Sequence, residues 1–250
     1  FDFVAVCDND PAKCDVAKEW IPSLQTYTDP RQMLVETRPD TVAIATWRDT
    51  HFEMMNLAID FGVKVIICEK PIAEKTEDAV AIVKRCRDEG VELLINHRRR
   101  FDTLLYDLKK DIDNGMIGEI VQGSSYYVYG LLTTGTHAVD ALRFLLRDVA
   151  GDVAWVSAFP NKLEAFSPPD DPCVDAIIGF ESGLKVTLQS LNIQDYDLFQ
   201  FDFYGRKGKI SLRNIGRDID IHRVIDSPEH EGFMELENQP SETRGGEPRG

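Results

Sequence analysis

Residues 63–71 read Val-Lys-Val-Ile-Ile-Cys-Glu-Lys-Pro, an apolar run that ends in a charged pair followed by proline. Short apolar runs of this kind are typical of buried strands. A helical pattern from Thr50 to Gly62 precedes the run, and a second one from Thr76 to Gly90 follows it. This alternation predicts a parallel sheet whose strands are connected by helices.

The alternation extends through the first 96 residues. Further strands are predicted at residues 3–7, 41–45 and 91–95, and further helices at 10–20 and 29–37, each with an aspartate cap and a proline at its first position. Thr76 is expected to cap the helix that follows it. The pattern favours a Rossmann-type, doubly wound α/β fold. That fold has a glycine-rich loop after a central first strand, and no Gly-x-Gly-x-x-Gly occurs near residue 1. We therefore expect the first strand to be missing.

The pattern changes after Asn96. Helices are predicted at residues 104–112 and within 131–146, and strands at 119–129, 153–163, 174–180, 184–191, 199–204 and 209–212. The short turn Glu181-Ser182-Gly183 favours an antiparallel hairpin. The tail from Ser227, rich in Gly, Pro and Glu, is expected to be a loop or an artificial end. We predict a Rossmann-like domain at 1–96, incomplete at its N-terminus. An α+β domain with an open, mostly antiparallel sheet is predicted at 97–250, incomplete at its C-terminus.

Composition limits the possible partners. The formal net charge of -15 repels polyanions and disfavours nucleic-acid binding. No apolar run approaches the roughly 20 residues of a membrane helix. The five cysteines are odd in number and widely spaced, which favours reduced thiols and a cytoplasmic protein. The five histidines show no ligand spacing, so no metal is expected.

Three segments could carry chemistry. Glu69 and Lys70 end a strand, and the carboxyl ends of strands line the ligand crevice in open α/β sheets. Pro71 disfavours helical geometry at Lys70, so the lysine side chain is displayed there. The segment from Thr46 through Trp47 to His51 also leaves a strand end, and His51 could face a bound ring.

The third segment runs from Leu132 to Asp140. A threonine is expected to cap a helix there, with His137 in the first turn, where the helix dipole disfavours imidazolium. A neutral histidine is suited to act as a general base. Asp140 could orient that histidine or simply favour the helix start. The tyrosines at 126, 127 and 129 could line a pocket or pack in the core.

These segments together resemble the glucose–fructose oxidoreductase/inositol dehydrogenase/MocA family. The resemblance is carried by the following runs: Ile44-Ala45-Thr46 with His51, Gly62 to Ala73, Asn96 with Arg99-Arg100-Phe101, Gly115 to Ile120, and Gly135 to Asp140. It implies a cofactor-binding Rossmann domain at 1–96 and a substrate-binding and oligomerisation domain at 97–250, with the active site between them. It also implies reversible hydride transfer between a carbohydrate or polyol hydroxyl and a nicotinamide cofactor, in a homo-oligomer (dimer or tetramer).

The resemblance also assigns residues. Lys70 matches the lysine that contacts substrate and cofactor, and His137 matches the histidine taken as acid/base. Cofactor contacts are expected at Asp8, Thr46, Trp47, His51, Glu69, Lys70 and Asn96, and substrate contacts at Lys70, Arg99, Thr133, Thr136 and His137. A carboxylate at Asp8, after the first visible strand, would accept hydrogen bonds from both ribose hydroxyls and repel a 2′-phosphate, which favours NAD over NADP.

The proton transfer leaves two assignments open. Lysine titrates near pH 10.4 in water and histidine near 6.5, so His137 is favoured as the base and Lys70 as the cation that polarises the carbonyl oxygen. The reverse assignment survives if the nicotinamide charge lowers the lysine pKa. Two residues depart from the family pattern: Thr133 stands where the family often has aspartate, and Trp47 where it commonly has proline. The missing acid at Thr133 leaves a catalytically silent nucleotide-binding sensor as an alternative. The resemblance leaves a second one, a lyase or hydrolase that recycles bound NAD, as some family members do.

Overall fold

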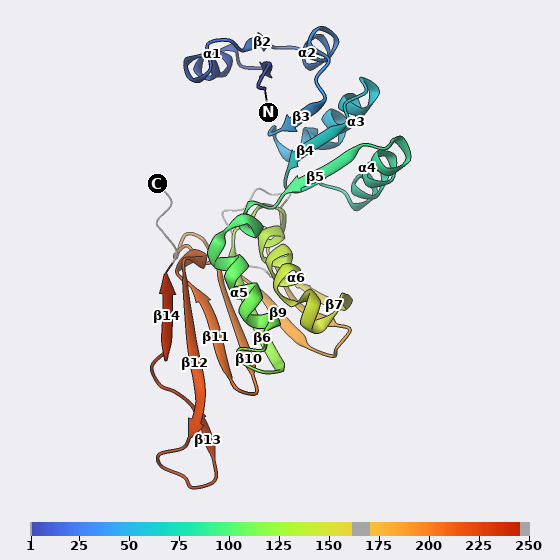
Figure 1. Ribbon diagram of the computed structural model, residues 1–250. Helices are drawn as coiled ribbons and strands as arrows, with labels where there is room; N and C mark the ends of the chain where they lie inside the picture. Colours follow the sequence, from blue (N-terminus) through green and yellow to red (C-terminus); the bar gives the residue numbers. More distant parts are fainter. Residues whose placement is uncertain (1, 162–170, 246–250) are drawn as a thin grey trace. The chain divides into compact units, whose positions relative to one another are not determined.

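The computed structural model describes residues 2–161 and 171–245. The chain divides into two compact units, Phe1–Asn96 (unit 1) and His97–Gly250 (unit 2). Figure 1 shows helices alternating with short strands in unit 1 and a broad sheet with two long helices in unit 2.

Unit 1 contains two small parallel sheets. In the first, β1 (Ala5–Cys7) pairs with β2 (Gln25–Tyr27), and in the second, β4 (Val65–Glu69) lies between β3 (Thr41–Ile44) and β5 (Glu92–Asn96). The connecting helices are α1 (Pro11–Trp20), α2 (Pro30–Thr37), α3 (His51–Asp60) with the 3-10 turn η1 (Arg48–Thr50) before it, and α4 (Thr76–Glu89). The predicted α/β architecture is confirmed. The three-residue strand β2 was not predicted, because its sequence Gln-Thr-Tyr is polar and short.

The predicted helix ends are mostly correct. Asp10 accepts a hydrogen bond from the Ala12 N–H at 3.0 Å, and Asp29 accepts one from the Arg31 N–H at 2.8 Å, as the aspartate–proline pairs predict. Gly90 ends α4 with a φ of 69°, in the left-handed region that favours glycine. The prediction for Thr76 is wrong, because Thr76 is the first helical residue and Lys75 precedes it without a side-chain cap.

Apolar side chains of α3, α4 and the central strand form the core of unit 1. Met55, Ala58, Ile66, Cys68 and Ile82 are fully buried. Burial raises the pKa of the Cys68 thiol to about 12, so this cysteine behaves as a small apolar residue. All five cysteines are free.

Unit 2 is built on one nine-stranded sheet. The strands are β6 (Ile120–Val128), β7 (Val153–Pro160), β8 (Val174–Phe180), β9 (Lys185–Leu191), β10 (Gln200–Gly205), β11 (Gly208–Arg213), β12 (Asp218–Asp226), β13 (Met234–Leu236) and β14 (Glu242–Gly245). Their order is β13-β12-β11-β10-β6-β9-β8-β7, and β14 also pairs with β12. The β6–β9 pair is parallel and the other pairs are antiparallel. The predicted open, mostly antiparallel sheet is confirmed.

Two predictions for unit 2 need correction. The tail from Ser227 is not a loop throughout, because β13 and β14 both pair with β12. The predicted strand at 153–163 ends at Pro160, and residues 162–163 lie outside the described part of the chain. The predicted hairpin is confirmed, since β8 and β9 pair antiparallel across Glu181–Gly183.

Helices α5 (Thr103–Asp113) and α6 (Thr136–Ala150) cover one face of this sheet (Figure 1). Leu108, Leu145 and Leu146 from the helices are buried with Phe201 and Phe203 from β10 in a single apolar cluster. Of the tyrosines left open by the sequence, Tyr127 is fully buried and Tyr129 is 37% exposed.

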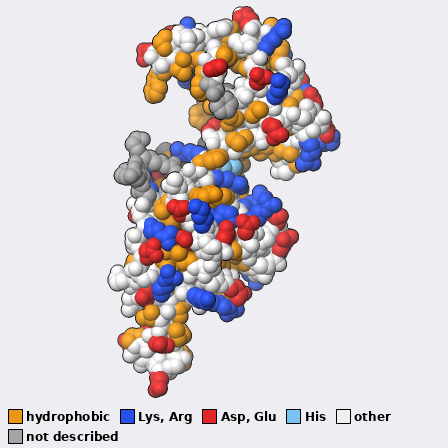
Figure 2. Space-filling view, in the orientation of Figure 1, with side chains coloured by type: hydrophobic (Ala, Val, Ile, Leu, Met, Phe, Trp, Pro, Cys, Tyr) orange, Lys and Arg blue, Asp and Glu red, His pale blue; other side chains and the backbone are white. Residues whose placement is uncertain are grey.

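Charged side chains of both signs are interspersed over the face of each unit seen in Figure 2. The net charge of -15 is therefore not gathered into one acidic patch on the face in view. Within the described residues, the helices fall short of the length and apolar character that a membrane crossing needs.

Candidate functional site

The carboxyl ends of β3, β4 and β5 bring several predicted site residues to one edge of unit 1. The parallel register places Ile44 beside Cys68, and Glu69 beside Asn96. The Asn96 side chain donates a hydrogen bond to Glu69 Oε1 at 2.7 Å. Lys70 follows directly after Glu69, and the Lys70–Pro71 peptide bond is cis. This edge is where ligands bind in open α/β sheets.

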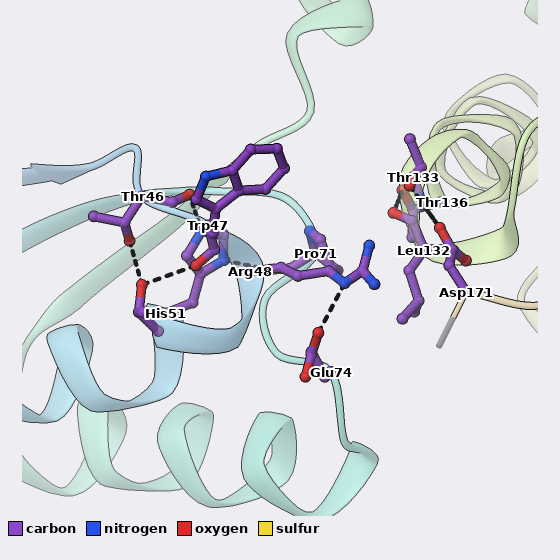
Figure 3. A network of polar contacts seen from close by, with 11 residues as sticks. Thr46, Trp47, Arg48, His51, Pro71, Glu74, Leu132, Thr133, Thr136 and Asp171 are labelled. Carbon is purple, nitrogen blue, oxygen red and sulfur yellow. Dashed lines mark hydrogen bonds and ion pairs between the residues drawn. The ribbon is translucent and has the colours of Figure 1, made fainter. Parts of the chain in front are cut away.

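His51 ties the ends of β3 and β4 together. The side chain is 1% exposed, with Nδ1 2.7 Å from the Pro71 carbonyl oxygen and Nε2 3.1 Å from the Thr46 carbonyl oxygen. Both ring nitrogens are therefore engaged with backbone of this edge (Figure 3). These contacts assign His51 to fixing the backbone at Thr46 and Pro71, rather than to presenting its ring to a ligand.

Trp47 and Arg48 extend from the same turn. Thr50 holds the turn, since both its N–H and its hydroxyl donate to the Trp47 carbonyl oxygen, at 3.0 and 2.8 Å. The indole of Trp47 is 83% exposed, while Arg48 Nε donates to Glu74 Oε1 at 2.8 Å (Figure 3). An exposed indole on a fixed backbone offers a flat apolar surface to a ring-containing ligand.

Asp8 lies one residue beyond β1. Its carboxylate accepts the Asp10 N–H at 2.9 Å, and Lys13 Nζ lies 3.5 Å from the same oxygen. The Asp8 side chain is 30% exposed, so it can still accept further hydrogen bonds. The sequence had shown no basic residue at positions 9–12, and the structure adds Lys13 as a cation beside this carboxylate.

In unit 2, the helix that carries His137 begins earlier than the sequence predicted. A π-helical turn, η3 (Leu131–Gly135), leads without a break into α6, and Gly135 has helical dihedral angles and no side-chain cap. The predicted threonine cap is therefore wrong, and His137 does not lie among the free N–H groups of a helix start. The dipole argument for a neutral His137 loses its basis.

The carboxylate of Asp171 binds the true start of this helix (Figure 3). It accepts the Leu132 N–H at 2.7 Å, the Thr133 N–H at 2.9 Å and the Thr133 hydroxyl at 2.5 Å. The side chain of Asp171 is fully buried. Sequence reasoning missed this residue, because Asp171 is 38 positions away from Thr133 and no local pattern connects the two.

His137 has a second histidine beside it. The His97 and His137 rings are nearly perpendicular, with centroids 5.9 Å apart. Asp140 pairs with Arg100 at 2.6 Å and has an oxygen 3.8 Å from His97 Nδ1. The sequence left open whether Asp140 orients His137 or only favours the helix start. Its contacts are with Arg100 and His97, so they favour neither role.

The two remaining predicted substrate residues make intramolecular contacts. The guanidinium of Arg99 lies 3.7 Å from the centroid of the Phe199 ring, and Nη1 donates to the Ile215 carbonyl oxygen at 3.3 Å. The Thr136 hydroxyl donates to the Leu132 carbonyl oxygen at 3.2 Å. The predicted site residues thus fall into two groups, Asp8 to Asn96 in unit 1 and Arg99 to His137 in unit 2.

Among the described residues, neither a surface hollow nor a metal site coincides with the predicted site residues. A hollow of about 450 Å³ in unit 1 is lined by residues of α1, β2 and α2, such as Cys14, Tyr27 and Glu36, and includes none of the predicted site residues. Among residues 2–161 and 171–245, no group of three or more His, Cys, Asp or Glu side chains is arranged to hold a metal ion.

Comparison with known proteins identifies the class. Residues 1–97 match the model of an oxidoreductase family, GFO_IDH_MocA, with an NAD-binding Rossmann fold. The chain is 30% identical over 244 residues to D-glucoside 3-dehydrogenase of Escherichia coli, covering 84% of this chain and 69% of that protein. It is 29% identical to an inositol 2-dehydrogenase of Gluconacetobacter diazotrophicus, covering 78% of this chain and 61% of that protein. The chain belongs to the glucose–fructose oxidoreductase/inositol dehydrogenase/MocA family.

The fold agrees with this membership. A solved levoglucosan dehydrogenase, in complex with NADH and levoglucosan, superposes with a TM-score of 0.78 at 18% identity, covering 97% of this chain and 70% of that one. The chain spans 47% to 61% of the length of the first curated relatives it matches.

Proposed function

We propose that this protein is an NAD-dependent dehydrogenase that transfers hydride between a carbohydrate or polyol hydroxyl and the nicotinamide ring. The observation that carries the proposal is the strand edge of unit 1, where Lys70 follows β4 and the Glu69–Asn96 hydrogen bond joins β4 to β5. Its relatives include dehydrogenases of glucosides and of inositol. The same fold is found in a dehydrogenase that binds NADH and a sugar.

The residues of unit 1 fit a dinucleotide. Asp8 offers a partly exposed carboxylate after β1, suited to ribose hydroxyls and unfavourable for a 2′-phosphate. The backbone at Thr46 and Trp47 is fixed by His51 and Thr50, which keeps this edge rigid before a ligand binds. When bound, the nicotinamide accepts the hydride. NAD is therefore the preferred cofactor, and NADP is disfavoured.

The protein's own residues handle the hydroxyl proton. His137 takes the proton as general base, and the Lys70 ammonium orients the substrate oxygen and stabilises its developing negative charge. Residues 1–96 serve as the cofactor-binding domain, and residues 97–250 provide the substrate-binding and oligomerisation domain. By the same family resemblance we propose that the sheet of unit 2 mediates a homo-oligomer, a dimer or a tetramer, which sedimentation analysis would test.

The test follows nicotinamide absorbance at 340 nm with the full-length protein, NAD or NADP, and a panel of inositols, aldoses, glucosides and sugar acids. Turnover with NAD on any of these supports the proposal and identifies the substrate class. Tight NAD binding with no turnover across the panel would instead support the silent sensor. Product formed without net change in NADH would indicate a lyase or hydrolase that recycles its cofactor.

One structural observation weakens the silent-sensor alternative. That alternative arose because Thr133 carries no charge where relatives often have aspartate. In this protein the Thr133 hydroxyl donates a hydrogen bond to the buried Asp171 carboxyl group, so an aspartate is present beside Thr133 although it comes from another part of the chain.

A further inference from the structure

The first turn of the helix that carries His137 has every N–H group bound. Leu131 N–H donates to the Pro172 carbonyl oxygen at 2.9 Å, and Leu132 and Thr133 donate to the Asp171 carboxylate. Thr134 N–H donates to the Gly130 carbonyl oxygen at 3.1 Å. Four such groups have no partner within an ordinary helix, and here two consecutive residues of a distant segment bind three of them.

This segment is anchored on the sheet as well as on the helix. The Tyr127 hydroxyl donates to the Val174 carbonyl oxygen at 2.8 Å and accepts the Val174 N–H at 3.1 Å. The Cys173 thiol lies 3.4 Å from the Tyr129 carbonyl oxygen. One end of the segment, Asp171 and Pro172, therefore binds the start of the helix, and the other end, Cys173 and Val174, binds Tyr127 on β6 and the next turn at Tyr129.

The backbone between β6 and the helix is shaped for this contact. A Cβ atom on Gly130 would lie 2.2 Å from Asp171 Cγ and 2.3 Å from its carbonyl oxygen, so only glycine permits the approach. The preceding residue, Tyr129, has a φ of 63°, a left-handed conformation that bulky residues rarely adopt. Such a conformation persists where surrounding contacts impose it, and it is enriched near functional sites.

The helix start also determines where His137 points. The turn at Leu131–Gly135 is π-helical, and its wider turn rotates every later side chain relative to a continuous α-helix. Thr133, which Asp171 holds at two atoms, belongs to this wider turn and lies four residues before His137, so the contact with Asp171 fixes the backbone that leads directly to His137.

We propose that Asp171 is a positioning residue: its buried carboxylate holds the π-helical turn at Thr133 and so sets the orientation and electrostatic environment of His137. The effect of Asp171 on the position of His137 does not depend on the proposed function, but its effect on kcat does. Asp171 acts through Thr133 and the helix backbone.

The decisive variants are Asp171→Asn and Asp175→Asn. Asparagine keeps one oxygen that can accept a hydrogen bond, but it has no charge. Its NH2 group replaces the other oxygen, so a donor then faces a donor of Leu132 or Thr133. Asp175, on β8, is the matched control, because its carboxylate also accepts a backbone N–H, from Ser190 at 2.8 Å, but within the described residues makes no hydrogen bond to the helix start. A third variant, Asp171→Asn with Thr133→Asp, returns the carboxylate to the same turn from the helix side.

The first readout does not need turnover. The imidazole Cε1–H signal of His137, assigned with His137→Asn, is followed by NMR in the full-length protein. Asp171→Asn is expected to shift this signal, the third variant to bring it back toward its original position, and Asp175→Asn to leave it in place. An unmoved signal in Asp171→Asn, with the protein folded, would overturn the proposal.

The second readout is kinetic. Asp171→Asn should lower kcat by about tenfold to a hundredfold, as expected when a reacting group is misplaced. KM for NAD should stay unchanged, and the third variant should recover most of the lost kcat. Equal kcat in Asp171→Asn and Asp175→Asn would overturn the proposal. A wild-type protein without turnover would overturn the proposed function instead, and the NMR signal would still decide the role of Asp171.

Discussion

Replacing Tyr127 with phenylalanine removes one oxygen atom from the interior of unit 2 and leaves the ring in place. Tyr127 is fully buried, and its hydroxyl both donates to and accepts from the backbone of Val174. Pro160, which stands opposite Val174 on β7, has no N–H to donate in its place. The substitution therefore leaves the N–H and C=O groups of Val174 without this partner.

The expected loss follows from those two groups. A buried backbone group without a partner costs about 1–3 kcal/mol, and partial access of water lowers the sum. We expect Tyr127→Phe to reduce the free energy of unfolding by about 2–4 kcal/mol. For a domain of this size, that corresponds to a fall in Tm of roughly 5–15 °C.

Calorimetry measures the change, and hydrogen exchange of peptides from β6 and β8 assigns it to unit 2. The assignment matters because a chain with two units need not unfold in a single step. Tyr126→Phe is the control, since the hydroxyl that contacts the Val174 backbone belongs to Tyr127 and not to its neighbour Tyr126. A Tm within 1–2 °C of wild type for Tyr127→Phe, roughly 0.5 kcal/mol, would refute the reasoning.

Three further predictions concern charge. Lys70→Met should lower kcat of NAD-dependent oxidation by about 100-fold or more, the scale of general acid–base contributions, and unchanged turnover would contradict its role. Asp8→Ala should weaken NAD binding more than NADP binding, measured by fluorescence titration, because the 2′-phosphate no longer meets a carboxylate; an unchanged NAD/NADP ratio would argue against the contact. Burial alone would raise the pKa of Asp202, but hydrogen bonds from Lys209, Ser211 and Gln200 hold that pKa below its usual range. The stabilisation from Asp202 is therefore present above about pH 4 and is lost as the pH falls through its lowered pKa, so urea unfolding of Asp202→Asn should differ from wild type at pH 7 and converge with it near pH 2.

Much of the fold could be predicted from local chemistry. Asp10-Pro11 and Asp29-Pro30 mark helix starts because a carboxylate binds free N–H groups and proline needs no partner there. Strand β12 was not predicted, although its Asp-Ile-Asp-Ile alternation of polar and apolar residues is typical of a strand with one buried face. By contrast, β14 (Glu-Thr-Arg-Gly) is polar and forms only because β12 offers it an edge.

The positions of candidate site residues could be predicted from the sequence where they follow the ends of strands. Their contacts could not be predicted where the partner is distant in sequence. The position of Lys70 and Asn96 at strand ends could be predicted because the carboxyl end of a buried strand is recognisable from its apolar run, while their roles in a site stay predictions. The burial of His51 against the Thr46 and Pro71 carbonyl oxygens could not be predicted, since it depends on how a helix packs over that edge. The π-helical turn and its partner Asp171 likewise have no local signature, because the contact spans 38 positions.

The position of β6 in its sheet also bears on how the chain acquires its structure. β6 lies between β9 and β10, which follow it by some 60 to 80 positions, after both helices of unit 2. During synthesis, α5 and α6 therefore emerge from the ribosome long before the strands that complete the sheet beneath them. Unit 1, whose strands pair with near neighbours in sequence, can form early. Unit 2 must wait with its apolar helix faces uncovered, so it is the part of the protein for which slow folding and dependence on chaperones are expected.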